Sequence, residues 1–526
     1  MDFVMEPLPR RLPVGIQSFE YIRRNDYVYV DKTAFLYRLV NQGKPYFLSR
    51  PRRFGKSLFL STLEAYFLGK RDLFHGLAIE RFESEWAQHA VLHLSLNAER
   101  YDTADSLRGI LEYQLGEWEK IYGASDTATS YSTRFMSVIR RASEQTGRGV
   151  VVLIDEYDKP LLRSFHDENL QEEFRQILTA FYTVLKDADP WLRFVFITGV
   201  TKFAQMGIFS NLNQLSDISF DADFAALCGM TRTEIEATFR PEIERMATER
   251  GKTYGEIMDE MTRLYDGYRF SETPMEGMYN PFSVLNALTK RTFRNYWFSS
   301  GTPTFLVEML RKTDFDLREL DGIRVLAASL TDDRADVNNP VPMIYQSGYL
   351  TIKDYDERFQ EYTLGFPNEE VKYGFLNFAA QFYTPVRESD TAFYIGKFIR
   401  ELETGDAEAF LSRLRAFFAG IPYELNDRTE RHYQVVFYLV FRLMGQFAET
   451  EVRSAHGRAD AIVRTADYLF VFEFKLNGTA EEALQQIGDR GYLIPFTADS
   501  RRLVKIGVEF DAAERNLGRW IIVEEK

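Results

Sequence analysis

Two sets of residues in this chain have the types and spacing that chemistry requires, and the first is a basic loop. Residues 50–57 read Arg-Pro-Arg-Arg-Phe-Gly-Lys-Ser. Backbone N–H groups at a helix start and one lysine neutralise a polyphosphate, and the hydroxyl after that lysine can hold Mg²⁺. The end of the loop supplies this pattern. We therefore expect a nucleotide to be bound by Arg52, Arg53, Phe54, Gly55, Lys56 and Ser57, with Ser57 also a Mg²⁺ ligand.

The first half of the loop departs from the usual phosphate-binding pattern. Arg50 stands where that pattern has its first glycine, so the usual permissive residue is missing. Arg52 and Arg53 partly offset the loss, because they bring positive charge beside the phosphate site, and Pro51 could fix the loop. The alternative is a basic turn between a strand and a helix that binds nothing.

An apolar run ending in two acids supplies a partner for this loop. Residues 149–156 read Gly-Val-Val-Val-Leu-Ile-Asp-Glu, a run too short for a helix. It is typical of a buried parallel strand with chemistry at its carboxyl end. We expect Asp155 to hold Mg²⁺ directly or through water, and Glu156 to polarise the attacking water. Asp158 is expected only to begin the next helix, with Pro160 in its first turn.

The second set of residues lies near the carboxyl terminus, in two apolar strands that read as a hairpin turning at residues 464–467. A turn centred on this stretch places Asp460 directly opposite Glu473, with their Cβ atoms about 5 Å apart. Period-two alternation puts Lys475 on the same face as Glu473. The hairpin therefore predicts two converging carboxylates and a lysine.

Two acids and a lysine on one face of apolar strands are costly to bury unless they pair or bind a cation. We expect Asp460 and Glu473 to hold a divalent metal that activates water against a phosphodiester. Lys475 would stabilise the hydroxide or the developing negative charge. The alternative is an acid–lysine salt bridge on the solvent face of the hairpin.

Composition places broad limits on the protein. The chain has 526 residues, 45% of them hydrophobic, and a net charge of -14. Its length is too great for one core, and its acidity argues against non-specific nucleic-acid binding without excluding a local basic channel. The single cysteine, Cys228, fits a reducing compartment. No secretory pattern or apolar span of about 20 residues is found, so we expect a cytoplasmic protein without membrane contact.

The elements that must position these residues predict an α/β architecture with three domains. We expect three domains, at residues 1–225, 226–390 and 391–526. The family resemblances given below imply that these are a P-loop domain with a parallel sheet, a helical lid and connector, and an α/β/α restriction-endonuclease-like domain. The finer expectations are strands at 27–30, 45–49, 91–96 and 193–198, a helix at 32–40 capped by Asp31, a capping box at Thr231–Glu234, and a helix at 430–444.

The basic loop, with Tyr-Val-Asp-Lys-Thr at 29–33, Ile-Asp-Glu-Tyr-Asp at 154–158 and Thr-Gly-Val at 198–200, resembles bacterial AAA-ATPase-like proteins over residues 8–225. The Arg-Pro-Arg-Arg-Phe-Gly-Lys-Ser form is usual in that family. The resemblance implies ATP and Mg²⁺ as cofactors and a P-loop ATPase of the additional-strand type. In such ATPases a polar residue after the next strand senses the γ-phosphate, and Thr198 and Thr201 are the candidates. The alternative for both is capping of the next turn.

The lid segments 266–270 and 279–283 also look like motifs of this family. Arg269 either reaches a nucleotide, in its own or a neighbouring subunit, or packs within the lid. ATPases of this type often assemble, so a homo-oligomer is compatible with the resemblance.

The order of elements after residue 395 resembles the PD-(D/E)xK nuclease superfamily. This resemblance implies that Asp460, Glu473 and Lys475 are catalytic, that Gln486 supports them, and that Mg²⁺ or Mn²⁺ is the metal. A further acidic ligand would be Glu430 or Glu451.

Together the two resemblances imply an ATPase that controls a nuclease-like domain acting on DNA or RNA, with a role in defence or as a toxin. One rival is an ATP-driven switch whose carboxyl-terminal domain binds nucleic acid or protein without cutting. Another is a nucleic-acid-stimulated motor.

Overall fold

A computed structural model describes residues 10–165, 167–202, 214–273, 276–300, 317–331, 339–384, 388–420, 430–445, 449–452, 460–475, 478–496, 499–511, 514 and 516–525. The chain forms two compact units. The first comprises Met1–Asp314 and Asp321–Val371, and the second comprises Phe315–Leu320 and Lys372–Lys526. The three domain boundaries expected from the sequence stay predictions.

The first unit is built on a parallel five-stranded sheet. All six residues of its third strand are buried, as the apolar run ending in Asp155 predicts. The strand that carries Thr198 lies between the strand of the basic loop and the strand that ends in Asp155, which confirms the additional-strand arrangement. In spatial order the strands are β2 (Val91–Ser95), β3 (Val150–Asp155), β4 (Leu192–Gly199), β1 (Pro45–Ser49) and β5 (Ser216–Asp217).

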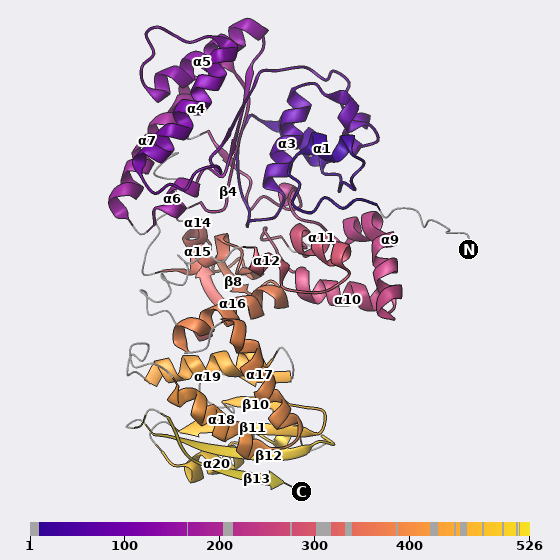
Figure 1. The fold of residues 1–526 in the computed structure, drawn as a ribbon, viewed down its shortest axis with the longest axis vertical. Coiled ribbons are helices and arrows are strands. Elements are labelled where there is room, and N and C mark those ends of the chain that lie inside the picture. The colour runs from indigo at the N-terminus through magenta and orange to yellow at the C-terminus, as the bar shows by residue number, and fades with distance from the viewer. Residues whose placement is uncertain are drawn as a thin grey trace, which may run out of the picture. The chain divides into compact units, whose positions relative to one another are not determined.

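Helices cover both faces of this sheet (Figure 1). Capping fixes where several of them begin, since Ser130 forms a capping box and Asp167 accepts a bond from Leu170 N. One face carries α4 (Ala104–Tyr122), α5 (Tyr131–Thr146) and α7 (Glu168–Asp187), and the other carries α1 (Phe19–Arg24) and α3 (Lys56–Phe67); α2 (Thr33–Gln42) and α6 (Lys159–Arg163) complete the layers.

The start of the chain differs from the expected strand at residues 27–30. Tyr27 forms only an isolated bridge with Arg11, and residues 28–30 belong to no strand. They line a cavity instead, so side-chain contacts replace a strand ladder. The helix expected at 32–40 begins at Thr33, and its N-cap residue is Lys32. Asp31, the expected cap, lies one residue earlier and accepts a bond from the backbone N–H of Thr33.

A helical lid follows the sheet, and the expected capping box at Thr231 and Glu234 is confirmed. Its apolar side chains form a core of their own, including Ile235, Phe239 and Met261. The lid contains α9 (Arg232–Arg250), α10 (Tyr254–Tyr265), α11 (Pro281–Lys290) and α12 (Tyr296–Ser299); a small antiparallel sheet then follows, made of β6 (Ile323–Leu326), β8 (Glu361–Gly365) and β7 (Thr351–Asp356), with α14 (Ala327–Thr331), α15 (Val341–Gln346) and α16 (Glu369–Tyr383).

The second unit is an α/β/α sandwich around a mixed sheet, as expected (Figure 1). Alternation along its central strand separates two cores: Phe472 packs against Phe410 and Phe441, whereas Leu469 and Val471 face the last helix. The strands in order are β13 (Asn516–Glu525), β12 (Arg502–Asp511), β11 (Tyr468–Lys475), β10 (Ala461–Arg464) and β9 (Glu449–Val452). Helices α17 (Glu388–Glu403), α18 (Ala407–Ala419) and α19 (Glu430–Met444) lie on one face and α20 (Ala480–Asp489) on the other.

Across the described ranges, no helix is both long and apolar enough to cross a membrane.

Candidate functional site

The basic loop connects the end of β1 to the start of α3 through two left-handed backbone positions. Gly55 has φ 95° and is the residue before the helix, where a side chain would be strained. Arg53 has φ 65°, and holding a non-glycine residue there costs about 1–2 kcal/mol. Strain of this size at a loop is typical of a functional segment, because the surrounding fold must enforce it.

Arg50 has a structural role that explains the missing glycine. Its side chain is only 2% exposed, and its guanidinium lies 4.2 Å from the centre of the Phe270 ring. Nη1 donates to the carbonyl oxygen of Ser219 at 2.7 Å. Burial lowers the pKa of Arg50, and backbone carbonyls and an aromatic ring take the place of a carboxylate. Arg50 thus joins the loop to the segment after β5.

Arg52 and Arg53, the two arginines expected beside the phosphates, point to different partners. Arg52 lies 4.9 Å from the ring centre of Trp297 and donates to the Tyr349 hydroxyl at 3.2 Å. Arg53 is exposed and lies 5.1 Å from the ring centre of Phe282, and among the described residues no carboxylate pairs with it. Both line the same cavity, but of the two only Arg53 has a guanidinium without a hydrogen bond or ion pair to the described residues.

Ser57, Asp155 and Thr198 are brought together at the carboxyl ends of the strands. Asp155 is buried at the end of β3 and accepts bonds from Ser57 Oγ at 2.6 Å and from Thr198 Oγ1 at 2.7 Å. Lys56 Nζ donates to the carbonyl oxygens of Arg50 and Pro51 at 2.9 and 3.1 Å. These groups are the ones expected at a Mg²⁺–polyphosphate site, since they combine a carboxylate, a hydroxyl and an ammonium.

Glu156 lies beside this group and lines the same cavity. Its backbone has φ 54°, a strained value for a residue with a side chain. Its carboxylate lies 3.3 Å from Lys159 Nζ, which also donates to the carbonyl oxygen of Asn97 at 2.9 Å. The expected water-polarising acid is therefore held at the edge of the site by an ion pair.

Asp158 does more than begin α6, which is the role expected from the sequence. Its carboxylate is 1% exposed and accepts bonds from the backbone N–H groups of Val200 and Thr201 and from the Thr201 hydroxyl. Burial raises the pKa of Asp158. Thr201, the second sensor candidate, is therefore engaged with Asp158. The Thr-Gly-Val-Thr stretch that begins at the end of β4 is the sequence signal of this turn.

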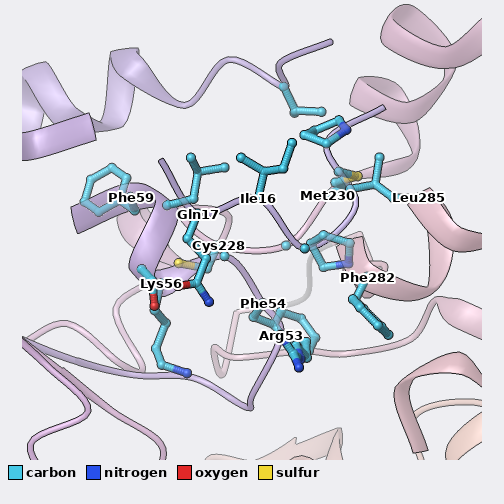
Figure 2. Close-up of a pocket in the computed structure, with 18 of the residues that line it drawn as sticks. Ile16, Gln17, Arg53, Phe54, Lys56, Phe59, Cys228, Met230, Phe282 and Leu285 are labelled. Carbon is cyan, nitrogen blue, oxygen red and sulfur yellow. The ribbon is translucent and has the colours of Figure 1, made fainter. Parts of the chain in front are cut away.

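A cavity of about 350 Å³ extends from the loop toward the lid. Figure 2 shows Lys56 and Phe59 on one side of it and Phe282 and Leu285 on the other. Sequence reasoning missed the apolar wall, because segments far apart in the chain converge there without a shared motif. The wall includes Ile16, Leu227, Met230, Phe239, Phe282 and Leu285.

The lid motif at 266–270 packs against the loop. The rings of Tyr268 and Phe270 lie 4.7 and 5.5 Å from that of Phe54, both near perpendicular. Arg269 donates its backbone N–H to Thr351 Oγ1 at 2.7 Å and its guanidinium to the carbonyl oxygen of Lys353 at 3.1 Å. Within this chain Arg269 therefore packs on β7.

The carboxyl-terminal hairpin has the expected register. Ala461 pairs with Phe472 in the antiparallel β10–β11 ladder, so Asp460 falls opposite Glu473. Asp460 Oδ2 accepts a bond from Phe474 N at 2.8 Å, while Phe474 packs on the opposite face against Phe437.

Helix α20 adds a further side chain to this site. Gln486 of α20 donates to Glu473 and accepts a bond from Lys475, so one amide joins the two residues that the sequence placed on one face. The three side chains form one hydrogen-bonded row on the α20 side of the sheet.

The electrostatics of this row fit a cation. Glu473 is 3% exposed, and burial, followed by the nearby Asp460 carboxylate, raises its pKa to about 7. Burial also raises the pKa of Asp460. Glu473 Oε2 is buried and has no hydrogen-bond partner among the described residues. An orphaned buried carboxylate oxygen beside a second carboxylate is what a divalent ion would satisfy.

The further acidic ligand is not resolved between its two candidates. Glu430 begins α19, and Glu451 lies in β9 opposite Ile462, but their side chains lie outside the described part of the structure. No cluster of three or more acidic, histidine or cysteine side chains suited to a metal occurs among the described residues.

Comparisons with known proteins give a family match for each of the two regions that contain these sites. Residues 13–209 match the family model of a predicted AAA-ATPase, and residues 428–520 match that of the PD-(D/E)XK nuclease superfamily. The chain is also 37% identical over 525 residues to an "Uncharacterized protein in vnfD 5'region" of Azotobacter chroococcum mcd 1, covering 98% of this chain and 99% of that protein. The chain therefore belongs to the AAA-ATPase-like proteins that carry a carboxyl-terminal PD-(D/E)XK nuclease superfamily domain.

Proposed function

We propose that the first unit binds and hydrolyses ATP with Mg²⁺. The observation that carries the proposal is the meeting of Ser57, Asp155 and Thr198 beside a cavity of about 350 Å³. The apolar wall suits a flat base, and the loop at its other end suits phosphates. The bound metal would neutralise charge on the phosphates.

The residues divide the work of this site. Lys56 would exchange the carbonyl oxygens of its own loop for phosphate oxygens, and Arg53 would add a charge that no carboxylate now compensates. Ser57 and Asp155 would hold Mg²⁺, and Glu156 would orient the attacking water once it leaves Lys159.

A substitution at the loop lysine tests nucleotide binding. Lys56→Ala is expected to remove binding of a fluorescent ATP analogue, because the ammonium is the central phosphate ligand. Lys44→Ala is the matched control, since Lys44 precedes the same strand at its opposite end and pairs with Asp189 on the surface. Equal binding by Lys56→Ala and the wild type would reject the site.

A second substitution separates binding from hydrolysis. Glu156→Gln is expected to keep ATP binding and lose at least about tenfold in turnover, a typical minimum for loss of a group that activates water. Phosphate release and nucleotide affinity are measured on the same preparation. Unchanged turnover would exclude Glu156 as the water-polarising residue.

We propose that the second unit is a metal-dependent nuclease. Asp460 and Glu473 would hold Mg²⁺ or Mn²⁺, Lys475 would stabilise negative charge on the reacting phosphate, and Gln486 would keep the row aligned. The orphaned oxygen of Glu473 supports this reading. A part in defence against foreign DNA, or as a toxin, rests on family analogy alone.

Cleavage is tested with purified protein on DNA and RNA, with and without ATP and with Mg²⁺ or Mn²⁺. Glu473→Ala is expected to abolish metal-dependent cleavage, whereas Glu481→Ala, an exposed acid on α20 that pairs with Arg519, is expected to leave it unchanged. Cleavage that survives Glu473→Ala would reject the assignment.

The rival is an ATP-driven switch that binds nucleic acid or protein without cutting. Absence of cleavage under every metal condition, together with retained binding of nucleic acid, would select the switch. Measuring the size of the protein with and without ATP tests the proposed homo-oligomer.

A further inference from the structure

Trp297 of the lid and Tyr349, which follows α15, contact Arg52 at its backbone and its side chain. The indole N–H of Trp297 donates to the carbonyl oxygen of Arg52 at 3.0 Å. The guanidinium of Arg52 lies 4.9 Å from the centre of the Trp297 ring and donates to the Tyr349 hydroxyl at 3.2 Å. Rings of Trp297 and Tyr349 lie 5.2 Å apart at 62°, so the two aromatic residues form one surface under the loop.

This surface leaves the loop little room to shift. Gly348 precedes Tyr349 and has φ 88°. A Cβ atom added to Gly348 would lie 2.5 Å from Cβ of Pro51, the residue before Arg52. No side chain fits between Gly348 and Pro51, so a shift of one must displace the other, because packed interiors contain few voids.

Glu370 fixes Trp297 from the other side. Trp297 is fully buried, and its backbone N–H donates to Glu370 Oε1 at 2.7 Å. The Ser283 hydroxyl donates to Glu370 Oε2 at 2.7 Å, so both carboxyl oxygens accept a bond. Glu370 is the second residue of α16, and from Lys372 onward that helix belongs to the second unit.

Phosphate binding would disturb this series of contacts at its start. Lys56 Nζ now donates to the carbonyl oxygens of Arg50 and Pro51. When Lys56 Nζ donates to a phosphate instead, the carbonyl groups of Arg50 and Pro51 lose their charged donor and must rearrange or become solvated. Their neighbour is the carbonyl oxygen that Trp297 holds.

We propose that the contacts from Arg52 through Trp297 to Glu370 tether the phosphate loop to the first turn of α16, so that nucleotide binding changes the stability of that turn. Trp297 is a positioning residue in this scheme. The inference rests on the proposed function of the loop and adds the element that responds to its occupancy. Coupling of this kind requires that the two nucleotide states differ in free energy at α16.

Hydrogen exchange of peptides covering Glu369–Tyr383, measured on the full chain with and without ATP and Mg²⁺, tests the tether. The wild type is expected to show roughly a tenfold change in exchange of the first-turn amides, and Trp297→Phe less than about a twofold change. Phenylalanine keeps a ring but lacks the N–H that holds Arg52. Trp118→Phe, a buried tryptophan of α4, is the control and is expected to respond as the wild type does.

A second variant covers the case in which Trp297→Phe fails to fold. Arg52→Ala removes the stacked guanidinium and its bond to Tyr349 and is expected to reduce the response in the same way. A response in Trp297→Phe or Arg52→Ala equal to that of the wild type overturns the tether. ATP binding by the wild type without any change at α16 also overturns it and leaves the proposed function intact, whereas no ATP binding overturns both.

Discussion

Burial raises the pKa values of the carboxyl groups of Asp158, Glu370 and Glu473, and their hydrogen bonds distinguish them. Asp158 accepts bonds from a turn after β4, and both oxygens of Glu370 are engaged by Ser283 and Trp297. Glu473 differs, because its Oε2 atom has no partner among the described residues. A buried acid whose oxygens are all engaged has no acceptor left for a ligand, whereas Glu473 keeps one beside the carboxylate of Asp460.

At the residue scale, the burial of Glu473 predicts that the free energy of unfolding depends on pH. Its pKa of about 7 in the folded chain exceeds the 4.5 of an ordinary glutamate, so only the folded state holds the proton between these pH values. Stability without metal should therefore fall as pH rises through this window, then stay low above it. Glu473→Gln carries no charge and should raise the free energy of unfolding at pH 8 by on the order of 1–3 kcal/mol.

Thermal unfolding of metal-free protein at pH 5 and pH 8 measures this effect, with Glu481→Gln as an exposed control. The stabilisation by Glu473→Gln should be smaller at pH 5, where the wild-type carboxyl of Glu473 is already protonated in the folded state. Mn²⁺ should stabilise the wild type more than the Glu473→Gln variant. Equal stabilisation by Glu473→Gln at the two pH values would contradict the conclusion that burial raises the pKa of Glu473.

At the scale of elements, strand order converts distant sequence positions into one site. Strand β4 pairs with both β1 and β3, so Thr198 at its end reaches Asp155, which also accepts a bond from Ser57. Gly199 ends that strand in contact with the turn after β3. The parallel order therefore gathers all three side chains at one edge, as expected at the carboxyl ends of parallel strands.

Gly199→Ala tests this packing. An added Cβ would lie 2.5 Å from a ring carbon of Tyr157 and 2.8 Å from Asp158 Oδ1, so the turn must shift. We expect a loss of about 1–3 kcal/mol in unfolding free energy and weaker nucleotide binding. Gly109→Ala in α4 meets no atom within 4 Å and should instead stabilise by up to about 1 kcal/mol. Equal effects in chemical denaturation would contradict the close approach.

At the scale of the whole molecule, the division into two compact units puts the two candidate sites in separate cores. The nucleotide cavity lies wholly within the first unit, and the row of Glu473, Lys475 and Gln486 lies within the second. Units with their own cores unfold with some independence, so a ligand of one need not stabilise the other equally.

Calorimetry of the full chain should therefore resolve two unfolding transitions. ATP with Mg²⁺ at about 100 times its dissociation constant should stabilise the first unit by about 2.7 kcal/mol, because ligand binds only the folded state. Lys56→Ala should remove this shift without removing either transition. A single transition that moves as a whole would contradict independent unfolding.

The sequence by itself determined the local elements and the chemistry they carry. The basic loop, the buried strand ending in Asp155, and the hairpin register that opposes Asp460 and Glu473 follow from short-range spacing, since period and turn length fix neighbours along a strand. The helix at 430–444 was likewise predicted with its correct bounds.

Only the tertiary structure decided which partner each charged residue meets. Arg50, Arg52 and Arg53 are close neighbours in the sequence, yet one is buried on backbone carbonyls, one stacks on Trp297, and one remains uncommitted. The apolar wall of the cavity and the fixing of Trp297 by Glu370 also come from segments far apart in the chain. Such contacts depend on long-range packing, which no local spacing encodes.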